Sequence, residues 1–133
     1  SRLESAVARL APAAIRGLAI VGLEPSAALG FRDEAPDLVS AGYRDAARVV
    51  RGAVRLFPEW IAEQRAAGAF ASDVFRPLPD GATMLIHGHC HQKALGSPGA
   101  LRAALSLIPQ LSLIELPTAC CGMAGAFGYE REH

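Results

Sequence analysis

The stretch ATMLIHGHCHQ, residues 82–92, decides how the second half of this chain folds. It begins with a short apolar run that has the length and composition of a buried strand. Directly behind that run, three histidines and Cys90 fall within positions 87–91. The stretch therefore predicts a strand whose carboxyl end carries side chains that are able to bind a metal ion.

Strand-like and helical segments alternate on both sides of this stretch. LAIVGL (18–23) and LSLIEL (111–116) are two more apolar runs of strand length. Helical spacing or helix-boundary residues mark four segments, residues 1–17, 43–57, 58–68 and 97–108. This alternation predicts an α/β fold, a small three-layer domain with a parallel sheet of about three to four strands flanked by helices. The 133 residues are expected to form a single domain with one hydrophobic core.

Each predicted strand runs into an unusual motif. The three motifs are LEPSA (23–27), HGHCH (87–91) and PTACCG (117–122). Because the carboxyl ends of parallel strands share one edge of a sheet, we expect all three motifs to meet there. Cys90 would then lie close to the Cys120–Cys121 pair. In the first motif, Glu24 could be a ligand, a base or a helix-capping acid, and a structural role is favoured.

The motifs leave the kind of metal open. Thiolates suit iron–sulfur clusters and zinc, but the spacing C-x29-CC is unlike the C-x2-C runs of ferredoxins and zinc ribbons. His89 and His91 flank Cys90 in an expected loop, where they would bind the metal or donate a hydrogen bond to a thiolate. His87 is expected to have a structural role. The alternatives without a metal are simple packing of the cysteines as small apolar residues, and thiol redox chemistry at Cys121.

The glycines of CGMAGAFG (121–128) are unlike a dinucleotide-binding fingerprint, because their spacing is G-x2-G-x2-G. We expect Gly122 and Gly125 to let the backbone come close to a cofactor and to direct amide N–H groups at a negatively charged centre.

Composition excludes several classes of protein. Thirteen basic and thirteen acidic residues balance, and no basic block predicts a nucleic-acid surface. No apolar run approaches the roughly 20 residues of a transmembrane helix, so we expect a soluble chain. Three cysteines, two of them adjacent, make a poor disulfide framework and favour a reducing compartment, with the cytoplasm as the default.

Longer stretches carry a resemblance to a known family. HGHCHQKAL and CCGMAGAFGYEREH, together with GLEPS and FRDE, resemble the C-terminal cysteine-rich (CCG) domain of FAD-linked oxidases. The same domain type occurs in the glycolate oxidase iron–sulfur subunit, in the small subunit of anaerobic glycerol-3-phosphate dehydrogenase and in the B subunit of heterodisulfide reductase. The resemblance covers residues 17–133 and implies that the chain is one half of such a domain, a C-terminal fragment of a larger oxidoreductase.

The resemblance implies a role in electron transfer. A flavin elsewhere in the parent enzyme would oxidise a 2-hydroxy acid such as D-lactate, glycolate or 2-hydroxyglutarate. Electrons would then pass through iron–sulfur centres of the 4Fe–4S type to an acceptor. Cys90, Cys120 and Cys121 would be ligands of the cluster or metal, and His89 or His91 could complete the set. The isolated fragment is expected to be inactive.

The expected partners are the flavin-binding and ferredoxin-like domains of the parent enzyme, in the cytoplasm or at the inner face of the membrane. Two departures from the family pattern stand out: Ala27 replaces the cysteine of EPSC, and the sequence stops at His133. The alternative function is a structural zinc-binding or protein-docking module without redox chemistry. A half-domain would also expose apolar surface, which predicts self-association into a homo-oligomer.

Overall fold

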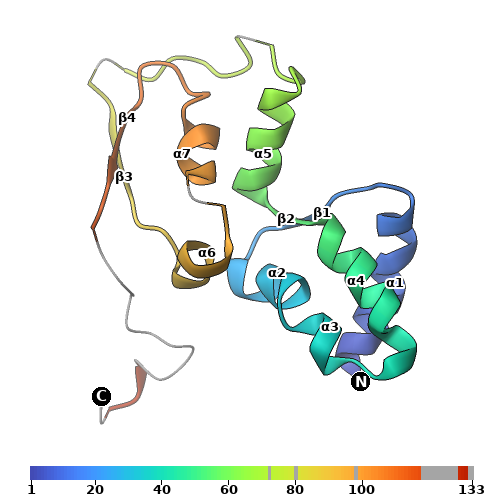
Figure 1. Ribbon diagram of the computed structural model, residues 1–133. Helices are drawn as coiled ribbons and strands as arrows, with labels where there is room; N and C mark the ends of the chain where they lie inside the picture. Colours follow the sequence, from blue (N-terminus) through green and yellow to red (C-terminus); the bar gives the residue numbers. More distant parts are fainter. Residues whose placement is uncertain (72, 80, 98, 118–128, 132–133) are drawn as a thin grey trace.

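The computed structural model describes residues 1–71, 73–79, 81–97, 99–117 and 129–131, and it confirms the α/β class (Figure 1). A single turn of 3-10 helix spans Ala41–Tyr43. The elements follow one another in the order α1 (Arg2–Ile15), β1 (Ile20–Gly22), α2 (Pro25–Arg32), α3 (Ala35–Leu38), α4 (Arg44–Ala53), β2 (Val54–Leu56), α5 (Phe57–Ala66), β3 (Thr83–Ile86), α6 (Cys90–Leu95), α7 (Ala100–Leu105) and β4 (Ser112–Glu115).

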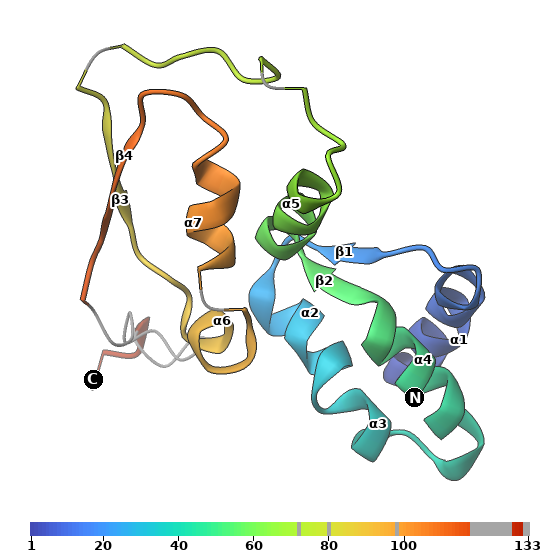
Figure 2. The same ribbon diagram turned by 45° about the horizontal axis from the view of Figure 1, so that its top comes forward.

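The strands pair in parallel, as predicted. Strand β1 pairs with β2, with Ile20 opposite Val54, and β3 pairs with β4, with Ile86 opposite Glu115. The described strands therefore form two two-stranded sheets rather than one sheet. Helices α5 and α7 lie side by side between the two sheets (Figure 2).

The hydrophobic core belongs to the N-terminal unit, which we define as residues 1–66. Helix α1 packs on α4, α2 packs on β2, and all four elements contribute residues to one buried cluster. The apolar stripe of α4 supplies Ala47 and Val50, which are fully buried. The core comprises Val7, Ala11, Ala28, Leu29, Val39, Ala47, Val50, Val54 and Leu56. Ile86 and Ala100 are the buried apolar residues of the C-terminal unit, the described residues of 83–117.

The predicted helix boundaries are confirmed where the sequence carries cap residues. Ser1 is the N-cap of α1 and forms a capping box with Glu4. Gly17 follows this helix with φ +80°, a conformation that glycine adopts without steric cost. Pro58 stands in the first turn of α5, where its missing N–H is not needed.

The end of the predicted helix 43–57 was wrong. Helix α4 ends at Ala53, and the next three residues form strand β2. Val54 and Leu56 are each 1% exposed, while Arg55 between them points to the other face. Pairing with β1 and burial of two alternate residues thus override the helical periodicity that continues through this segment.

None of the helices in the described part of the chain has both the length and the apolar character needed to cross a bilayer.

Candidate functional site

Cys90 lies at the start of a helix rather than in the predicted loop. Strand β3 ends at Ile86, and α6 begins at Cys90, whose thiol is free and exposed. His89 is the N-cap, and its Nδ1 accepts a hydrogen bond from the backbone N–H of His91 at 3.3 Å. This ring therefore satisfies one of the free N–H groups at the start of α6.

The capping bond restricts what His89 can do for a metal. A neutral imidazole has one accepting nitrogen, and its other nitrogen carries the hydrogen. Since Nδ1 accepts here, the hydrogen lies on Nε2. Binding a metal through Nε2 would move that hydrogen to Nδ1 and break the cap. The His91 ring is not used in this way, and its centroid lies 5.7 Å from that of His89.

The described residues contain no group of three His, Cys, Asp or Glu side chains that could hold a metal ion. Cys90 offers one exposed sulfur, so a metal at this position would need ligands from elsewhere in the chain. Cys120, Cys121, Gly122 and Gly125 lie outside the described residues. Their predicted roles, and their approach to Cys90, stay predictions.

Glu24 is a helix-capping acid, as favoured from the sequence. The segment that was expected to be a turn is helix α2, and Glu24 is its N-cap. Its carboxylate accepts hydrogen bonds from the N–H groups of Ser26 at 2.9 Å and Ala27 at 2.6 Å. These two bonds, led by that of Ala27, lower the pKa of Glu24, and the nearby His89 contributes in the same direction.

Two of the three predicted motifs lie next to each other. Helix α2, which follows LEPSA, packs against α6, which follows HGHCH (Figures 1 and 2). Glu24 and His89 interact at the starts of the two helices. At their ends, Arg32 donates a hydrogen bond to the carbonyl oxygen of Leu95 at 3.4 Å.

The third motif begins at the same edge of the β3–β4 sheet as the second. Strands β3 and β4 end together, and the N–H of Leu116 donates to the carbonyl oxygen of Ile86 at 2.9 Å. Pro117, the first residue of PTACCG, follows immediately. The carboxyl ends of both strands of this sheet therefore share one edge, as expected for a parallel pair.

A cavity of about 690 Å³ lies at this edge, between the strand ends, α6 and α7. The Lys93 side chain crosses Gly88, where an added Cβ would lie 3.0 Å from the Lys93 Cε atom. Lys93 and Arg102 bring two positive charges to the cavity wall, and Glu115 brings one negative charge. The volume is in the range of small-ligand sites. Arg102 and Glu115 pair with each other at 3.5 Å, so Lys93 is the further charge among the lining residues that the structure describes.

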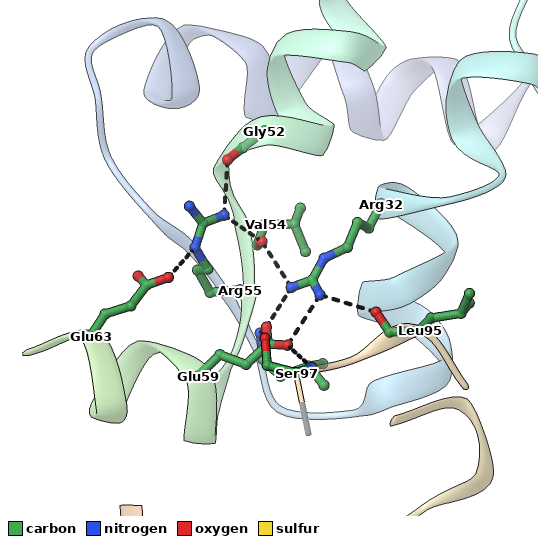
Figure 3. Close-up of polar contacts among 9 residues, drawn as sticks. Arg32, Gly52, Val54, Arg55, Glu59, Glu63, Leu95 and Ser97 are labelled. Carbon is green, nitrogen blue, oxygen red and sulfur yellow. Dashed lines mark hydrogen bonds and ion pairs between the residues drawn. The ribbon is translucent and has the colours of Figure 1, made fainter. Parts of the chain in front are cut away.

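Sequence reasoning missed a partly buried ion pair between Arg32 and Glu59 behind this site (Figure 3). Glu59 is the third residue of α5 and accepts a hydrogen bond from the N–H of Leu56, which is the second half of a capping box. The acid that follows Pro58 could have indicated this cap. Nothing in the sequence indicates that Arg32, 27 residues earlier, is its partner.

The site thus belongs to a small α/β unit with a free thiol at the carboxyl edge of a parallel strand pair. No family model matches the chain. Over 119 residues it is 24% identical to the C subunit of the anaerobic glycerol-3-phosphate dehydrogenase of Escherichia coli strain K12, and the O157:H7 protein gives the same value. The alignment covers 90% of this chain and 28% of the length of these relatives. No solved structure matches.

The chain is therefore a distant relative of a dehydrogenase subunit, which is consistent with a redox-related role. Anaerobic glycerol-3-phosphate dehydrogenase is also among the enzymes to which the sequence motifs point.

Proposed function

We propose that this chain is the cysteine-rich part of an oxidoreductase subunit and that it holds an iron–sulfur cluster through Cys90, Cys120 and Cys121. The observation that carries this proposal is the position of Cys90. The exposed thiol of Cys90 lies at the start of α6, near the edge where β3 and β4 end. In the sequence, the Cys120–Cys121 pair follows a few residues after β4. The distant similarity to a dehydrogenase subunit supports the same interpretation.

A thiolate-held cluster accepts and releases single electrons. The chain's own residues would bind it and adjust its surroundings. His91 is a stronger candidate than His89 for a fourth ligand, because the Nδ1 atom of His89 caps α6. Gly122 and Gly125 would direct amide N–H groups at the cluster. Lys93, on the cavity wall, would offset part of its negative charge.

In this proposal the electrons come from a flavin in another part of the parent enzyme, where a 2-hydroxy acid is oxidised. The name of the relatives adds glycerol 3-phosphate as a candidate substrate. The expected partners are the flavin-binding and ferredoxin-like domains of that enzyme, and the expected compartment is the cytoplasm or the inner face of the membrane.

The test is anaerobic reconstitution of the chain with iron and sulfide, followed by a visible spectrum and elemental analysis. We expect broad visible absorption and matched iron and sulfide in the wild type, and loss of both in Cys90→Ser. Ala94→Ser changes an exposed residue of the same helix and should behave as the wild type. A colourless protein with stoichiometric zinc would support the structural zinc module instead.

A second variant tests the missing ligand. Ala27 is exposed in the first turn of α2, the helix that packs against α6. Ala27→Cys should raise the iron and sulfide content after reconstitution, because it supplies the thiolate that the resemblance expects there. Ala27→Ser is the control and should give no gain. An unchanged iron content in Ala27→Cys would count against a cluster at this edge.

A further inference from the structure

The ion pair between Arg32 and Glu59 joins the N-terminal unit to the end of α6. Glu59 is 5% exposed, and Arg32, the last residue of α2, is 23% exposed. The contact is bidentate: Nη1 of Arg32 donates to Oε1 of Glu59 at 3.1 Å, and Nη2 donates to Oε2. Among the described residues, Glu59 is the one buried charged side chain.

Both side chains also bind backbone on two sides (Figure 3). Toward β2, Nη2 of Arg32 donates to the carbonyl oxygen of Val54 at 3.1 Å, and the N–H of Leu56 donates to Glu59 at 2.9 Å. Toward α6, Arg32 donates to the carbonyl oxygen of Leu95, and the N–H of Ser97 donates to Glu59 at 2.8 Å. The pair therefore bridges β2 and the segment that closes α6.

Helix α6 needs such support because it has six residues. A helix of this length is not stable by itself, so contacts at its ends decide where it lies. At its end, the N–H of Gly96 donates to the carbonyl oxygen of Gln92 at 2.9 Å. An added Cβ at Gly96 would lie 2.6 Å from that oxygen, so glycine allows the close approach.

We propose that Arg32 and Glu59 are positioning residues for Cys90. They hold the end of α6 against β2 and α5. In this way they fix where the short helix presents the thiol of Cys90 at its start. The proposal rests on the proposed function, since it takes Cys90 to be a ligand of the cluster. Its structural part, the hold on α6, can be tested without any metal.

Positioning can be separated from simple stabilisation. Apolar residues of similar volume often replace a buried ion pair at little cost to stability. They cannot, however, replace the hydrogen bonds to Leu95 and Ser97. The double variant Arg32→Met/Glu59→Leu should therefore restore much of the stability that Glu59→Gln loses, and should still release α6.

The first measurement is hydrogen exchange by mass spectrometry on the metal-free chain. The readout is the exchange rate in α6 divided by that in α4 of the same protein. Because α4 reports global unfolding, the ratio isolates α6 in variants whose global stability matches the wild type. We expect this ratio to rise about tenfold in the double variant, whose global stability is largely restored, as for loss of hydrogen bonds to charged groups. Glu63→Gln is the matched control, because Glu63 lies on the same helix and pairs with Arg55 of β2 at 2.7 Å. An unchanged ratio in the double variant would overturn the proposal.

The second measurement is iron and sulfide uptake with a visible spectrum, on the same four proteins. We expect lower uptake or a shifted spectrum in Glu59→Gln and the double variant, and a wild-type result for Glu63→Gln. Normal uptake and spectrum together with a released α6 would refute positioning of Cys90. If the wild type takes up no iron, the proposed function fails, and the exchange ratio still decides whether the pair holds α6.

Discussion

At the residue scale, Glu59 is held ionised by its neighbours although burial alone would favour its neutral form. Burial raises its pKa, but Arg32 and the N–H groups of Leu56 and Ser97 outweigh that effect and lower the pKa to about 2. A carboxylate with a lowered pKa contributes stability above its ordinary pKa of 4.5, and this contribution is lost as the pH falls toward 2.

We therefore predict that acid destabilises the wild type more steeply than Glu59→Gln between pH 4.5 and pH 2. At pH 7 the variant should be less stable by about 3 kcal/mol, because it leaves the Arg32 charge unpaired. Urea unfolding at several pH values measures both effects. Glu4 and Glu24 also have lowered pKa values, but they are present in both proteins and cancel in the comparison. Parallel stability curves for the two proteins would refute the role given to Glu59.

His89 offers a second prediction at this scale. His89→Asn keeps a side-chain acceptor at the N-cap of α6 and removes Nε2, whereas His89→Ala removes the cap. We expect His89→Asn to match the wild type in stability and in iron uptake, and His89→Ala to lose about 1 kcal/mol. His91→Gln should lower iron uptake. Loss of iron in a fully stable His89→Asn protein would instead make His89 a ligand.

At the element scale, the helices and strands with strong local signals could be predicted from the sequence. Ser1 and Pro58 mark two helix starts, and the apolar runs 83–86 and 112–115 are strands. Helix α2 also had a signal, because an acid followed by Pro25 is typical of an N-cap and first turn. Helix α6 had none, since histidine is not a usual N-cap residue. Strand β2 is three residues long. This is too short for the alternation of apolar and polar residues to be distinguished from the helical pattern before it.

Close packing between β1 and α2 gives a prediction at this scale. A Cβ added at Gly22 would lie 2.2 Å from the Cβ of Ala28, a buried residue of α2. Gly22→Ala should therefore separate strand and helix and cost about 1–3 kcal/mol or more. Gly52→Ala is the control: Gly52 lies in α4 with open space around it, so alanine should add about 0.5–1 kcal/mol. Chemical unfolding measures both. A stable Gly22→Ala protein would show that β1 and α2 do not pack this closely.

At the scale of the whole molecule, the candidate site lies in the part of the chain with the smaller core. Ten of the twelve buried apolar residues that the structure describes precede residue 57. The order of elements could predict that the strand ends of β3 and β4 share an edge, because that follows from parallel pairing. It could not predict the split into two sheets or the ion pair behind α6, because both depend on contacts between segments far apart in the chain.

This uneven core predicts a gradient of stability. Two-stranded sheets are marginal in isolation, and Thr83, Met84 and Leu85 of β3 are exposed, so β3 and β4 should open locally without global unfolding. Amides of α1 and α4 should exchange only on global unfolding. We expect exchange in β3 and β4 to be at least about tenfold faster than in α4, a difference of roughly 1.4 kcal/mol. Native-state hydrogen exchange in low urea measures this gradient. Equal protection in both units would show instead that the N-terminal core and the Cys90 site unfold as one cooperative body, and that the Arg32–Glu59 pair couples them fully.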